Sequence, residues 1–368
     1  MPTTAPAIVA IGTAVPPTTL EQTVARDLIA AQPGLTPLGR RLVGAAFDGS
    51  AIATRSVVLD ELVDRTDSPF LDAETGALRS PSTRVRNDRY AERAPELALD
   101  AARAALRDGG LEPEAVTHVV TASCTGFFAP GLDHILVRDL GLPTPTPRLH
   151  VGFMGCYAAF PALRAADAIC RADPSAVVLV VCVELCSLHL RSSSDPDTIV
   201  ASSVFADGAG AALVTAQPSP RGLRIDALAS AIAPSSEEEM AWTIGDEGFE
   251  MVLSGAVPRL IGHHVVEAIA PLEAQRDAAA WPAVAGWAIH PGGRSILDTV
   301  QRTLDLDDGQ LADSRAVLAE RGNMSSATVL HILERQLRSR ADGEQVCAMA
   351  FGPGLTMESA LLTMQVAG

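Results

Sequence analysis

Two stretches of the sequence decide the fold: HVVTASCTGFFAPGLDHILVRDLGL at 118–142 and WAIHPGGRSILDTVQRTLDL at 287–306. In each, a short apolar run ends at a polar side chain, Cys124 in the first stretch and His290 in the second. A turn with proline and glycine follows, and then apolar residues recur at the spacing of an amphipathic helix. The shared order of strand, turn and helix indicates that the chain contains a duplicated unit.

The spacing of the residues that follow supports the duplication. Cys156 lies 32 residues after Cys124, and Asn323 lies 33 residues after His290. Each is preceded by a glycine and followed by a small-residue helix, which leads into a short apolar strand. We therefore predict two related βαβαβ halves. Equivalent points of such halves face one another near a pseudo-twofold axis, so Cys156, His290 and Asn323 should converge.

Apolar runs alternate along the chain with longer amphipathic stretches, which predicts an α/β fold with mostly buried strands. The segment QPSPRG at 217–222 is the best candidate for a boundary between the two halves. We expect an N-terminal half at 1–220 that carries the cysteine and a C-terminal half at 221–368 that carries the histidine and the asparagine.

Composition restricts the class of protein. With 368 residues, 48% hydrophobic and 20% charged, the chain can bury a large core and is globular. The 28 basic against 44 acidic residues give a net charge of −16, which argues against a nucleic acid or an anionic membrane surface as the main partner. The sequence has no lysine, so chemistry that depends on a Schiff-base or phosphate-loop lysine is excluded.

We expect a cytosolic protein without stable membrane insertion. No basic residue precedes Arg26, so the charged region of a secretion signal is missing. The longest apolar run, AVVLVVCV at 176–183, is far shorter than the roughly 20 residues that cross a bilayer. The six cysteines form no CxxC pair, which favours free thiols over disulfides or zinc, and we expect no metal.

Cys156, His290 and Asn323 form a set with a chemical meaning. Cys156 lies where a loop enters a helix, and the positive end of the helix dipole favours a thiolate there. His290 follows a strand, at the edge where open α/β sheets bind ligands. Alone, each has an ordinary explanation: a buried structural cysteine, a core histidine and a helix-capping asparagine. Together they supply a nucleophile, a base and a neutral hydrogen-bond donor.

Papain-like proteases have the same order of cysteine, histidine and asparagine along the chain. His290 lies 134 positions after Cys156, which fits the spacing in those proteases. However, the C-G-[SA]-C-[WY] signature is missing, and Cys156 lies far from the N-terminus. The protease interpretation is therefore not favoured.

Four motifs carry a family resemblance that extends over nearly the whole chain. They are GFMGCYAAFPALR around Cys156, WAIHPGGRSILD around His290, GNMSSATVLHIL around Asn323, and FGPGLTMESALL at 351–362. With these motifs in this order, the chain resembles the type III polyketide synthases, the chalcone-synthase-like branch of the thiolase-fold condensing enzymes. The resemblance implies a five-layered αβαβα core, a homodimer, and acyl-CoA and malonyl-CoA as substrates without a further cofactor.

The resemblance also implies a role for each residue of the set. Cys156 is expected to be acylated by a starter acyl-CoA. The enolate formed by decarboxylation of malonyl-CoA then attacks the Cys156 thioester in a Claisen condensation. His290 and Asn323 would donate two hydrogen bonds to the developing enolate oxygen.

The resemblance also implies which residues of this sequence would line the substrate cavity. Phe205 matches the family's gatekeeper phenylalanine, and Met251 falls on or near a second gatekeeper position. The other cavity positions are Cys124, His189, Ala129 and Ser325. In chalcone synthase the first two are threonines, and the third is a methionine that reaches into the partner subunit.

The resemblance also indicates where the phosphates of CoA would bind. It points to Arg55 and to backbone N–H groups near Gly292 and Gly293. The lysines that are common in this part of the family are missing here. Arginines and backbone N–H groups would have to replace them.

Positions at which this sequence differs from chalcone synthase indicate which acyl starter the cavity would accept. Ala129 in place of methionine should open space, and an aromatic content of 4% suits aliphatic cavity walls. The segment CVELCSLHL at 182–190 is similar to bacterial and fungal alkylresorcinol and alkylpyrone synthases. We therefore expect a medium or long fatty acyl starter, two or three malonyl extensions, and cyclisation to a resorcinol or an α-pyrone.

Two alternatives stay open. A ketosynthase III, which performs one condensation with an acyl carrier protein, uses the same three residue types. The FGPGL and GNMSSA segments favour the polyketide synthase, and a net charge of −16 does not favour the basic patch that docks a carrier protein. A non-catalytic scaffold of the same fold would be expected to lose the nucleophile, and Cys156 is present.

Overall fold

The computed structural model describes residues 5–234, 236–273 and 284–367. Within them, nine strands form one mixed sheet in the order β11-β12-β13-β8-β1-β7-β6-β4-β5. The strands are β1 (Ala7–Ala14), β4 (His118–Ser123), β5 (Arg148–Gly152), β6 (Val177–Leu185), β7 (Asp207–Thr215), β8 (Arg221–Ile232), β11 (Gly286–Ile289), β12 (Gln345–Gly352) and β13 (Thr356–Val366). The helices around them are α4 (Thr83–Gly109), α5 (Leu132–Leu140), α6 (Ala159–Ala172), α8 (Val257–Glu273), α9 (Arg294–Leu304), α10 (Ala312–Arg321) and α11 (Thr328–Ser339).

The nine strands divide into two groups at the junction of β1 and β8. These two strands pair at only two positions, Ala7 with Arg224 and Ile8 with Leu223. On one side of the junction lie the five strands of the N-terminal half, and on the other side the four strands of the C-terminal half. The nine strands therefore form two sheets, one from each half, which are joined only by the short pairing of β1 with β8.

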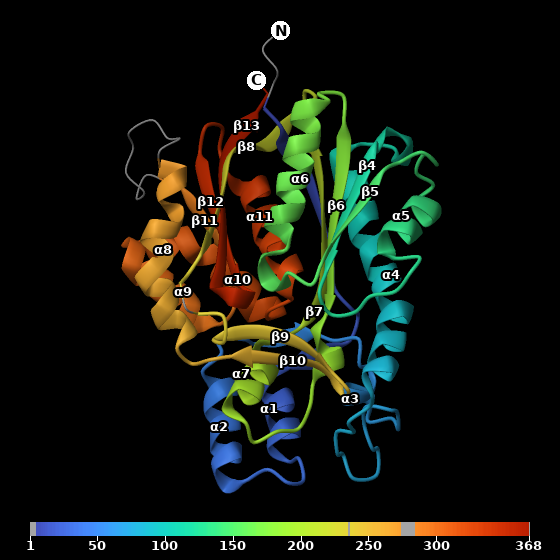
Figure 1. The fold of residues 1–368 in the computed structure, drawn as a ribbon, viewed down its shortest axis with the longest axis vertical. Helices are drawn as coiled ribbons and strands as arrows, with labels where there is room; N and C mark the ends of the chain where they lie inside the picture. Colours follow the sequence, from blue (N-terminus) through green and yellow to red (C-terminus); the bar gives the residue numbers. More distant parts are fainter. Residues whose placement is uncertain (1–4, 235, 274–283, 368) are drawn as a thin grey trace.

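Helices α6 and α11 lie between the two groups of strands (Figure 1). Their apolar faces, which include Phe160, Leu163, Leu330 and Leu333, form one buried cluster with the inner faces of both groups. Helices α4 and α5 cover the outer face of the N-terminal strands, and α8 and α9 cover the outer face of the C-terminal strands. These five layers confirm the predicted αβαβα, thiolase-like fold of two related halves.

Small side chains allow the layers to lie close together. Helix α4 buries Ala98, Ala101 and Ala105 against the sheet. A Cβ atom at Gly12 of β1 would lie 2.2 Å from the backbone nitrogen of Ala105, so only glycine fits between this strand and the helix. Close approach of the backbones therefore packs the alanine-rich helix α4 against the sheet as much as large side chains do.

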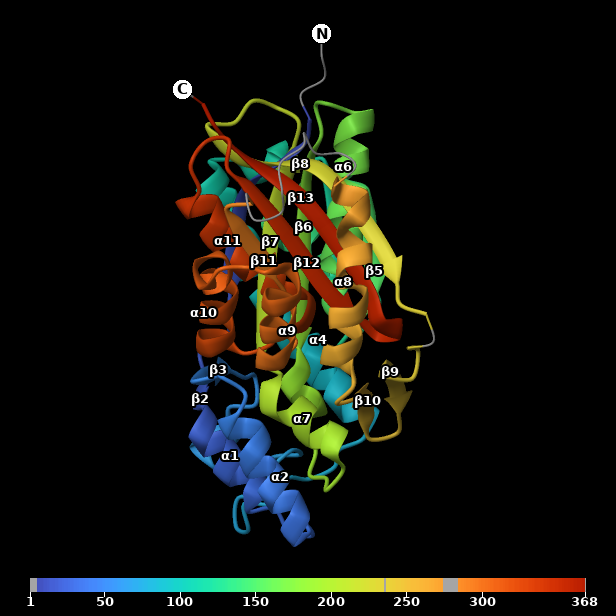
Figure 2. The same cartoon turned by 90° about the vertical axis from the view of Figure 1, so that its left-hand side faces the viewer.

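Smaller elements cover the end of the molecule at which β6 and β12 finish (Figures 1 and 2). They are the helices α1 (Gln22–Ala30), α2 (Pro37–Asp48), α3 (Glu61–Asp64) and α7 (Pro196–Val204), the pair β2 (Thr19–Glu21) and β3 (Thr54–Ser56), and the hairpin of β9 (Met240–Gly245) and β10 (Gly248–Leu253). Short 3-10 turns, η2 (Gly155–Tyr157) and η6 (Ser325–Ala327), precede α6 and α11 and contact each other. The equivalent helix starts of the two halves therefore meet, as the repeat predicts.

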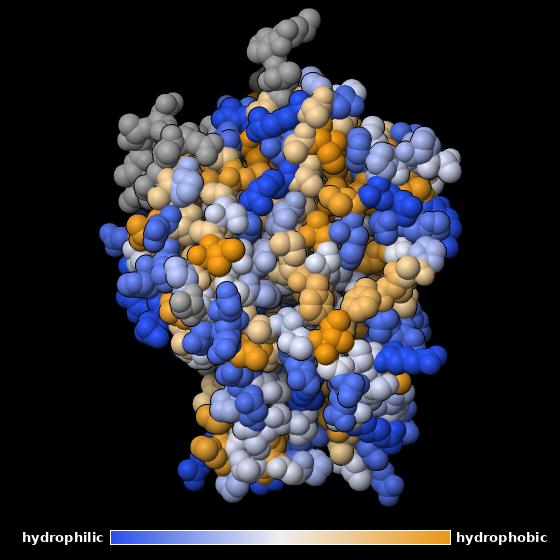
Figure 3. Space-filling model, in the orientation of Figure 1, coloured by the Kyte–Doolittle hydropathy of each residue, from blue (hydrophilic) through white to orange (hydrophobic). Residues whose placement is uncertain are grey.

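Two further observations describe the outside of the molecule. Apolar side chains are scattered among hydrophilic ones on the face shown in Figure 3. None of the helices in the described residues combines the length and the apolarity that a membrane span requires.

Candidate active site

Cys156 lies in η2, directly before α6. Gly155 has a φ of +72°, and a Cβ atom at this position would lie 2.5 Å from Cδ of Pro353. Glycine alone combines the left-handed backbone with so close an approach. Pro353, in the loop that follows β12, thereby becomes part of the wall around the Cys156 thiol, and Cys156 is only 6% exposed.

Asn323 reaches Cys156 from the other half of the chain. Its backbone N–H donates to the carbonyl of Val204 at 2.9 Å, and its carbonyl accepts from the N–H of Ala206 at 2.8 Å. Its side-chain oxygen accepts the N–H of Ser325 at 2.8 Å. The side-chain NH2 group remains to bind Cys156, and this hydrogen bond acts to lower the pKa of the thiol.

His290 follows β11, at the predicted edge of the sheet. Its backbone N–H donates to the carbonyl of Met349 on β12, the strand whose end contacts η2. The residue is 1% exposed, and neither ring nitrogen has a hydrogen-bond partner among the described residues. Buried polar atoms without a partner are rare and require an explanation, such as a ligand or a bound water. Burial lowers the pKa of His290 to about 3, which keeps the ring neutral at pH 7.

The thiol itself departs from the prediction made for a helix start. Burial is the largest influence and raises the pKa of Cys156 to about 12, against the smaller lowering effects of Ser325 and Asn323. The enclosed position therefore outweighs the expected preference for the thiolate. Burial therefore favours the neutral form of both the thiol and the imidazole.

A second group of polar side chains adjoins the thiol. The Oγ atom of Ser325 lies 3.5 Å from the Sγ atoms of both Cys156 and Cys124. Behind them, the Glu184 carboxylate accepts from the backbone N–H of Cys124 at 3.0 Å and from Oγ of Ser326 at 2.6 Å. Burial raises the pKa of Glu184. Sequence reasoning missed this glutamate, although a lone carboxylate inside the fully buried strand β6 was a signal for it.

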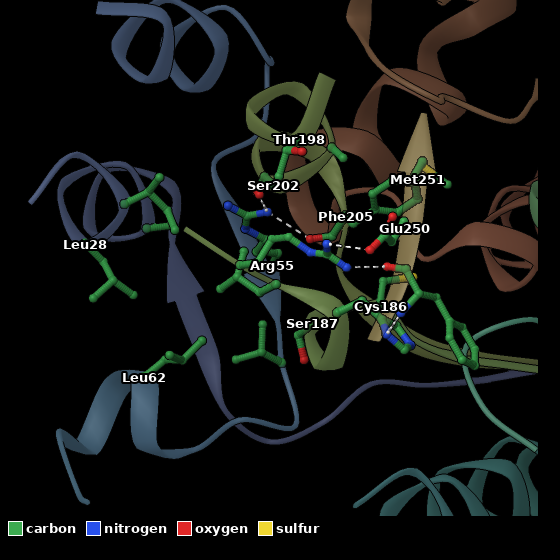
Figure 4. A pocket seen from close by; sticks show the side chains of 18 of the residues that line it. Leu28, Arg55, Leu62, Cys186, Ser187, Thr198, Ser202, Phe205, Glu250 and Met251 are labelled. Atoms are coloured by element: carbon green, nitrogen blue, oxygen red, sulfur yellow. Dashed lines mark hydrogen bonds and ion pairs between the residues drawn. The ribbon is translucent and has the colours of Figure 1, made fainter. Parts of the chain in front are cut away.

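Phe205 and Met251 lie where the predicted gate would be. They line the small chamber of Cys156, which Ser325 and Cys124 also line. They also line a larger, mostly apolar cavity of about 260 Å³ (Figure 4). The wall that the two spaces share also contains Cys186 and Trp242, which the sequence analysis did not single out.

His189 borders the larger cavity and not the chamber of Cys156. Its Nδ1 accepts the backbone N–H of Phe249 at 3.0 Å, so Nε2 carries the proton and donates to the carbonyl of Thr125 at 2.8 Å. The ring stacks on Phe249 with centroids 4.4 Å apart. Burial lowers the pKa of His189 to about 3, and the neutral ring fixes the β9–β10 hairpin to the cavity wall.

Ala129 lies in a different place from the other predicted cavity residues. It lines a separate pocket of about 300 Å³ together with Tyr90, Phe127 and residues of β5. Because β5 is the last strand of the sheet, this pocket lies toward the sheet edge.

Arg55, which the resemblance predicts to bind the phosphates of CoA, lies inside the protein. Arg55 is 4% exposed, and its Nη1 donates to the backbone carbonyls of Ser202 at 2.7 Å and Phe205 at 2.8 Å. The guanidinium is thus bound to the protein backbone, and Arg55 also lines the cavity of about 260 Å³. The resemblance did not show which way this side chain points.

Gly292 and Gly293 line a cavity of about 680 Å³ beside the start of α9. Three arginines that the sequence analysis missed, Arg259, Arg294 and Arg302, line the same cavity. Cations and the N-terminus of a helix are the groups that bind phosphates. A glycine pair directly before a helix that begins with arginine was the signal for this site.

Comparison with known proteins identifies the family. Residues 3–218 match the N-terminal domain of chalcone and stilbene synthases, and residues 224–366 match their C-terminal domain. The chain therefore belongs to the chalcone and stilbene synthase family.

Individual relatives agree with this assignment. "Probable polyketide synthase 1" of Dictyostelium discoideum is 30% identical over 362 residues, which are 96% of this chain but 11% of that protein. This chain thus spans a small part of that relative's length. The crystal structure of the C-terminal type III polyketide synthase domain of Steely1, a type I/III hybrid from Dictyostelium, has a TM-score of 0.89 at 28% identity and covers 99% of this chain and 100% of that chain. PKS-I from the brown alga Ectocarpus siliculosus has the same TM-score at 30% identity, with 99% of each chain covered.

Proposed function

We propose that this enzyme is a type III polyketide synthase that extends a fatty acyl starter with malonyl-CoA on Cys156. One observation carries the proposal: the buried Cys156 thiol meets the Asn323 amide, and neutral His290 has two ring nitrogens without a partner among the described residues. A thiol, a base with no competing partner and an amide donor are the groups that this reaction needs.

Acyl transfer comes first. His290 accepts the proton of the Cys156 thiol, and the sulfur attacks the carbonyl of the starter thioester. The bond to the sulfur of CoA breaks, and the leaving thiolate takes the proton back from His290. Because the proton only passes between groups inside the site, no isolated charge has to form at either buried residue.

Condensation follows in the same chamber. Malonyl-CoA loses its carboxylate as CO2, and the electron pair of the broken bond remains as an enolate. The imidazole N–H of His290 and the Asn323 amide donate hydrogen bonds to the enolate oxygen. The enolate carbon attacks the Cys156 thioester, the carbon–sulfur bond breaks, and the product is a β-ketoacyl-CoA. The Cys156 thiolate that leaves takes up one proton from solvent, which restores the neutral thiol.

The two larger cavities suggest how the substrates lie. The cavity beside α9, with its three arginines, would hold the phosphates of CoA. The cavity that Phe205 lines would hold the alkyl part of the starter, because Leu20, Leu28, Ile29 and Leu62 are among the residues that line it. We propose two or three extensions and cyclisation to an alkylresorcinol or an alkyl-α-pyrone.

The experiment is incubation of purified protein with malonyl-CoA and acyl-CoA starters from acetyl to palmitoyl, with products identified by mass spectrometry. We expect tri- or tetraketide pyrones or resorcinols, best formed from medium or long starters, and no product from Cys156→Ala. A single β-ketoacyl product, or activity only with carrier-protein thioesters, would overturn the proposal in favour of one-step condensation.

A further inference from the structure

Arg55 joins three elements at the edge of the site. It lies on β3, and Figure 4 shows its guanidinium bound to the backbone at Ser202 and Phe205, where α7 ends. The guanidinium carbon lies 5.3 Å from the ring centre of Phe47 on α2. One side chain thus ties β3 and α2 to the residue that separates the two cavities.

This arrangement is costly for a residue that only fills space. No carboxylate lies within ion-pair distance of Arg55 among the described residues, and its Nε has no hydrogen-bond partner there. Burial lowers the pKa of Arg55 to about 10, against a smaller raising effect of Asp207, so it stays charged at pH 7. A buried cation without a contacting anion is usually less stable than an apolar residue of similar volume. The hydrogen bonds of Arg55 to two backbone carbonyls therefore indicate a role other than packing.

The backbone around Phe205 leads from Arg55 to Asn323. Phe205 and Asn323 form an isolated parallel bridge, through the hydrogen bonds of Asn323 to Val204 and Ala206. A Cβ atom at Gly322, directly before Asn323, would lie 3.4 Å from Cβ of Arg55. Arg55 therefore contacts both the gate residue and the residue next to the amide that binds Cys156.

We propose that Arg55 is a positioning residue for the condensation. By fixing the carbonyls of Ser202 and Phe205, it sets the place of the Phe205 ring between the cavities and, through the bridge, the place of the Asn323 amide beside Cys156. This inference rests on the proposed function. It predicts an effect on turnover and on the number of extensions, because Asn323 serves the enolate and Phe205 borders the space into which the chain grows.

The test compares Arg55→Gln and Arg55→Lys with Arg221→Gln. Arg221 is a matched control, because its guanidinium also donates to two backbone carbonyls, those of Leu337 and Arg340. It lies at the start of β8, where it pairs with Val366 of β13, and it lines neither the Cys156 chamber nor the larger cavity. Rates are normalised to the Cys156 thiols that iodoacetamide can alkylate, so that misfolded enzyme does not count. For Arg55→Gln we expect kcat to fall by about 10–100-fold, the range that small misplacement of reacting groups produces. The KM for malonyl-CoA should change little.

Product lengths give the second measurement. Arg55→Gln should release a larger share of products with fewer extensions, Arg55→Lys should recover part of the wild-type pattern, and Arg221→Gln should match wild type. Unchanged normalised kcat and product pattern in Arg55→Gln would overturn the proposal. Failure of both Arg55 variants to fold would overturn it as well, since the arginine would then be needed for the fold itself. If the wild-type enzyme makes no polyketide, the proposed function has failed, independently of Arg55.

Discussion

At the scale of single residues, the site depends on two groups whose charged forms are both disfavoured by burial. Burial raises the pKa of Cys156 to about 12 and lowers the pKa of His290 to about 3. Separately, each would be inert at neutral pH. In the proposed reaction the Cys156 thiol gives its proton to the His290 imidazole, and the sulfur is reactive only while the imidazole can hold that proton.

This coupling predicts how Cys156 reacts with iodoacetamide. In His290→Ala the thiol has lost its proton acceptor, so alkylation at pH 7 should be at least about tenfold slower than in wild type. Without the imidazole, the raised pKa of Cys156 alone sets the fraction of thiolate. The alkylation rate should therefore rise about tenfold per pH unit between pH 7 and 10. Exposed His263 provides the control variant His263→Ala, which should behave as wild type. Equal rates in wild type and His290→Ala at pH 7 would contradict the coupling.

A second prediction at this scale concerns the donor to the enolate. Asn323→Ala removes one of the two donors and should lower kcat by about 10²–10³-fold, the usual cost of losing one such hydrogen bond. The thiol should still be alkylated stoichiometrically, because Cys156 and His290 remain. The measurement is steady-state turnover with the best starter, and a kcat within about threefold of wild type would show that the amide has no part in the reaction.

At the scale of elements, the internal repeat accounts for the position of the site. Strand, turn and helix recur with matching spacing, so the sequence alone places the starts of α6 and α11 together, along with Cys156 and Asn323. The orientation of side chains could not be obtained in this way. Arg55 and Arg294 are both arginines near glycines and apolar runs, and only the packing of the elements shows that Arg55 is buried whereas the Arg294 side chain is 54% exposed.

The contact of β1 with α4 gives a prediction of stability. Gly12→Ala would place Cβ against backbone atoms of α4 and should lower the free energy of unfolding by about 3 kcal/mol or more, since the backbone must move. Gly44 on α2 is the matched control, because a Cβ there meets nothing within 4 Å. Gly44→Ala should be neutral or stabilising by up to about 1 kcal/mol. Urea denaturation compares the two, and a Gly12→Ala protein as stable as wild type would refute the close packing.

The cavity beside α9 gives a prediction of substrate binding. Arg294→Gln combined with Arg302→Gln removes two cations near the proposed CoA phosphates and should raise the KM for malonyl-CoA about 10–100-fold, with a smaller effect on kcat. Arg84→Gln, at an arginine whose side chain is 90% exposed, is the control for the loss of surface charge. If the double variant and the control have the same KM, CoA binds elsewhere.

At the scale of the whole molecule, the N-terminal strands leave one edge open. β5 pairs with β4 alone among the described strands, and most of its residues are exposed. An exposed strand edge is a place where another chain can pair. Apolar side chains gather there: Leu149 on β5 is 46% exposed, Phe127 is 53% exposed, and Phe153 follows the strand at 36%. Exposed apolar side chains that cluster at one edge of a sheet indicate a surface that binds another protein chain.

We therefore propose a homodimer that associates through β5, and expect light scattering to give twice the mass of the chain. Leu149→Glu places a charge at the open edge and should shift the protein toward the monomer, because a charge without a partner is costly to bury in an interface. Leu38→Glu is the control, since Leu38 on α2 is 65% exposed at a different surface. A monomeric mass for wild type, or a Leu149→Glu dimer as stable as that of Leu38→Glu, would show that this edge is not the interface. Because Ala129 lines the pocket beside β5, a dimer that forms there would bring a second subunit next to that pocket and make it part of an interface between chains.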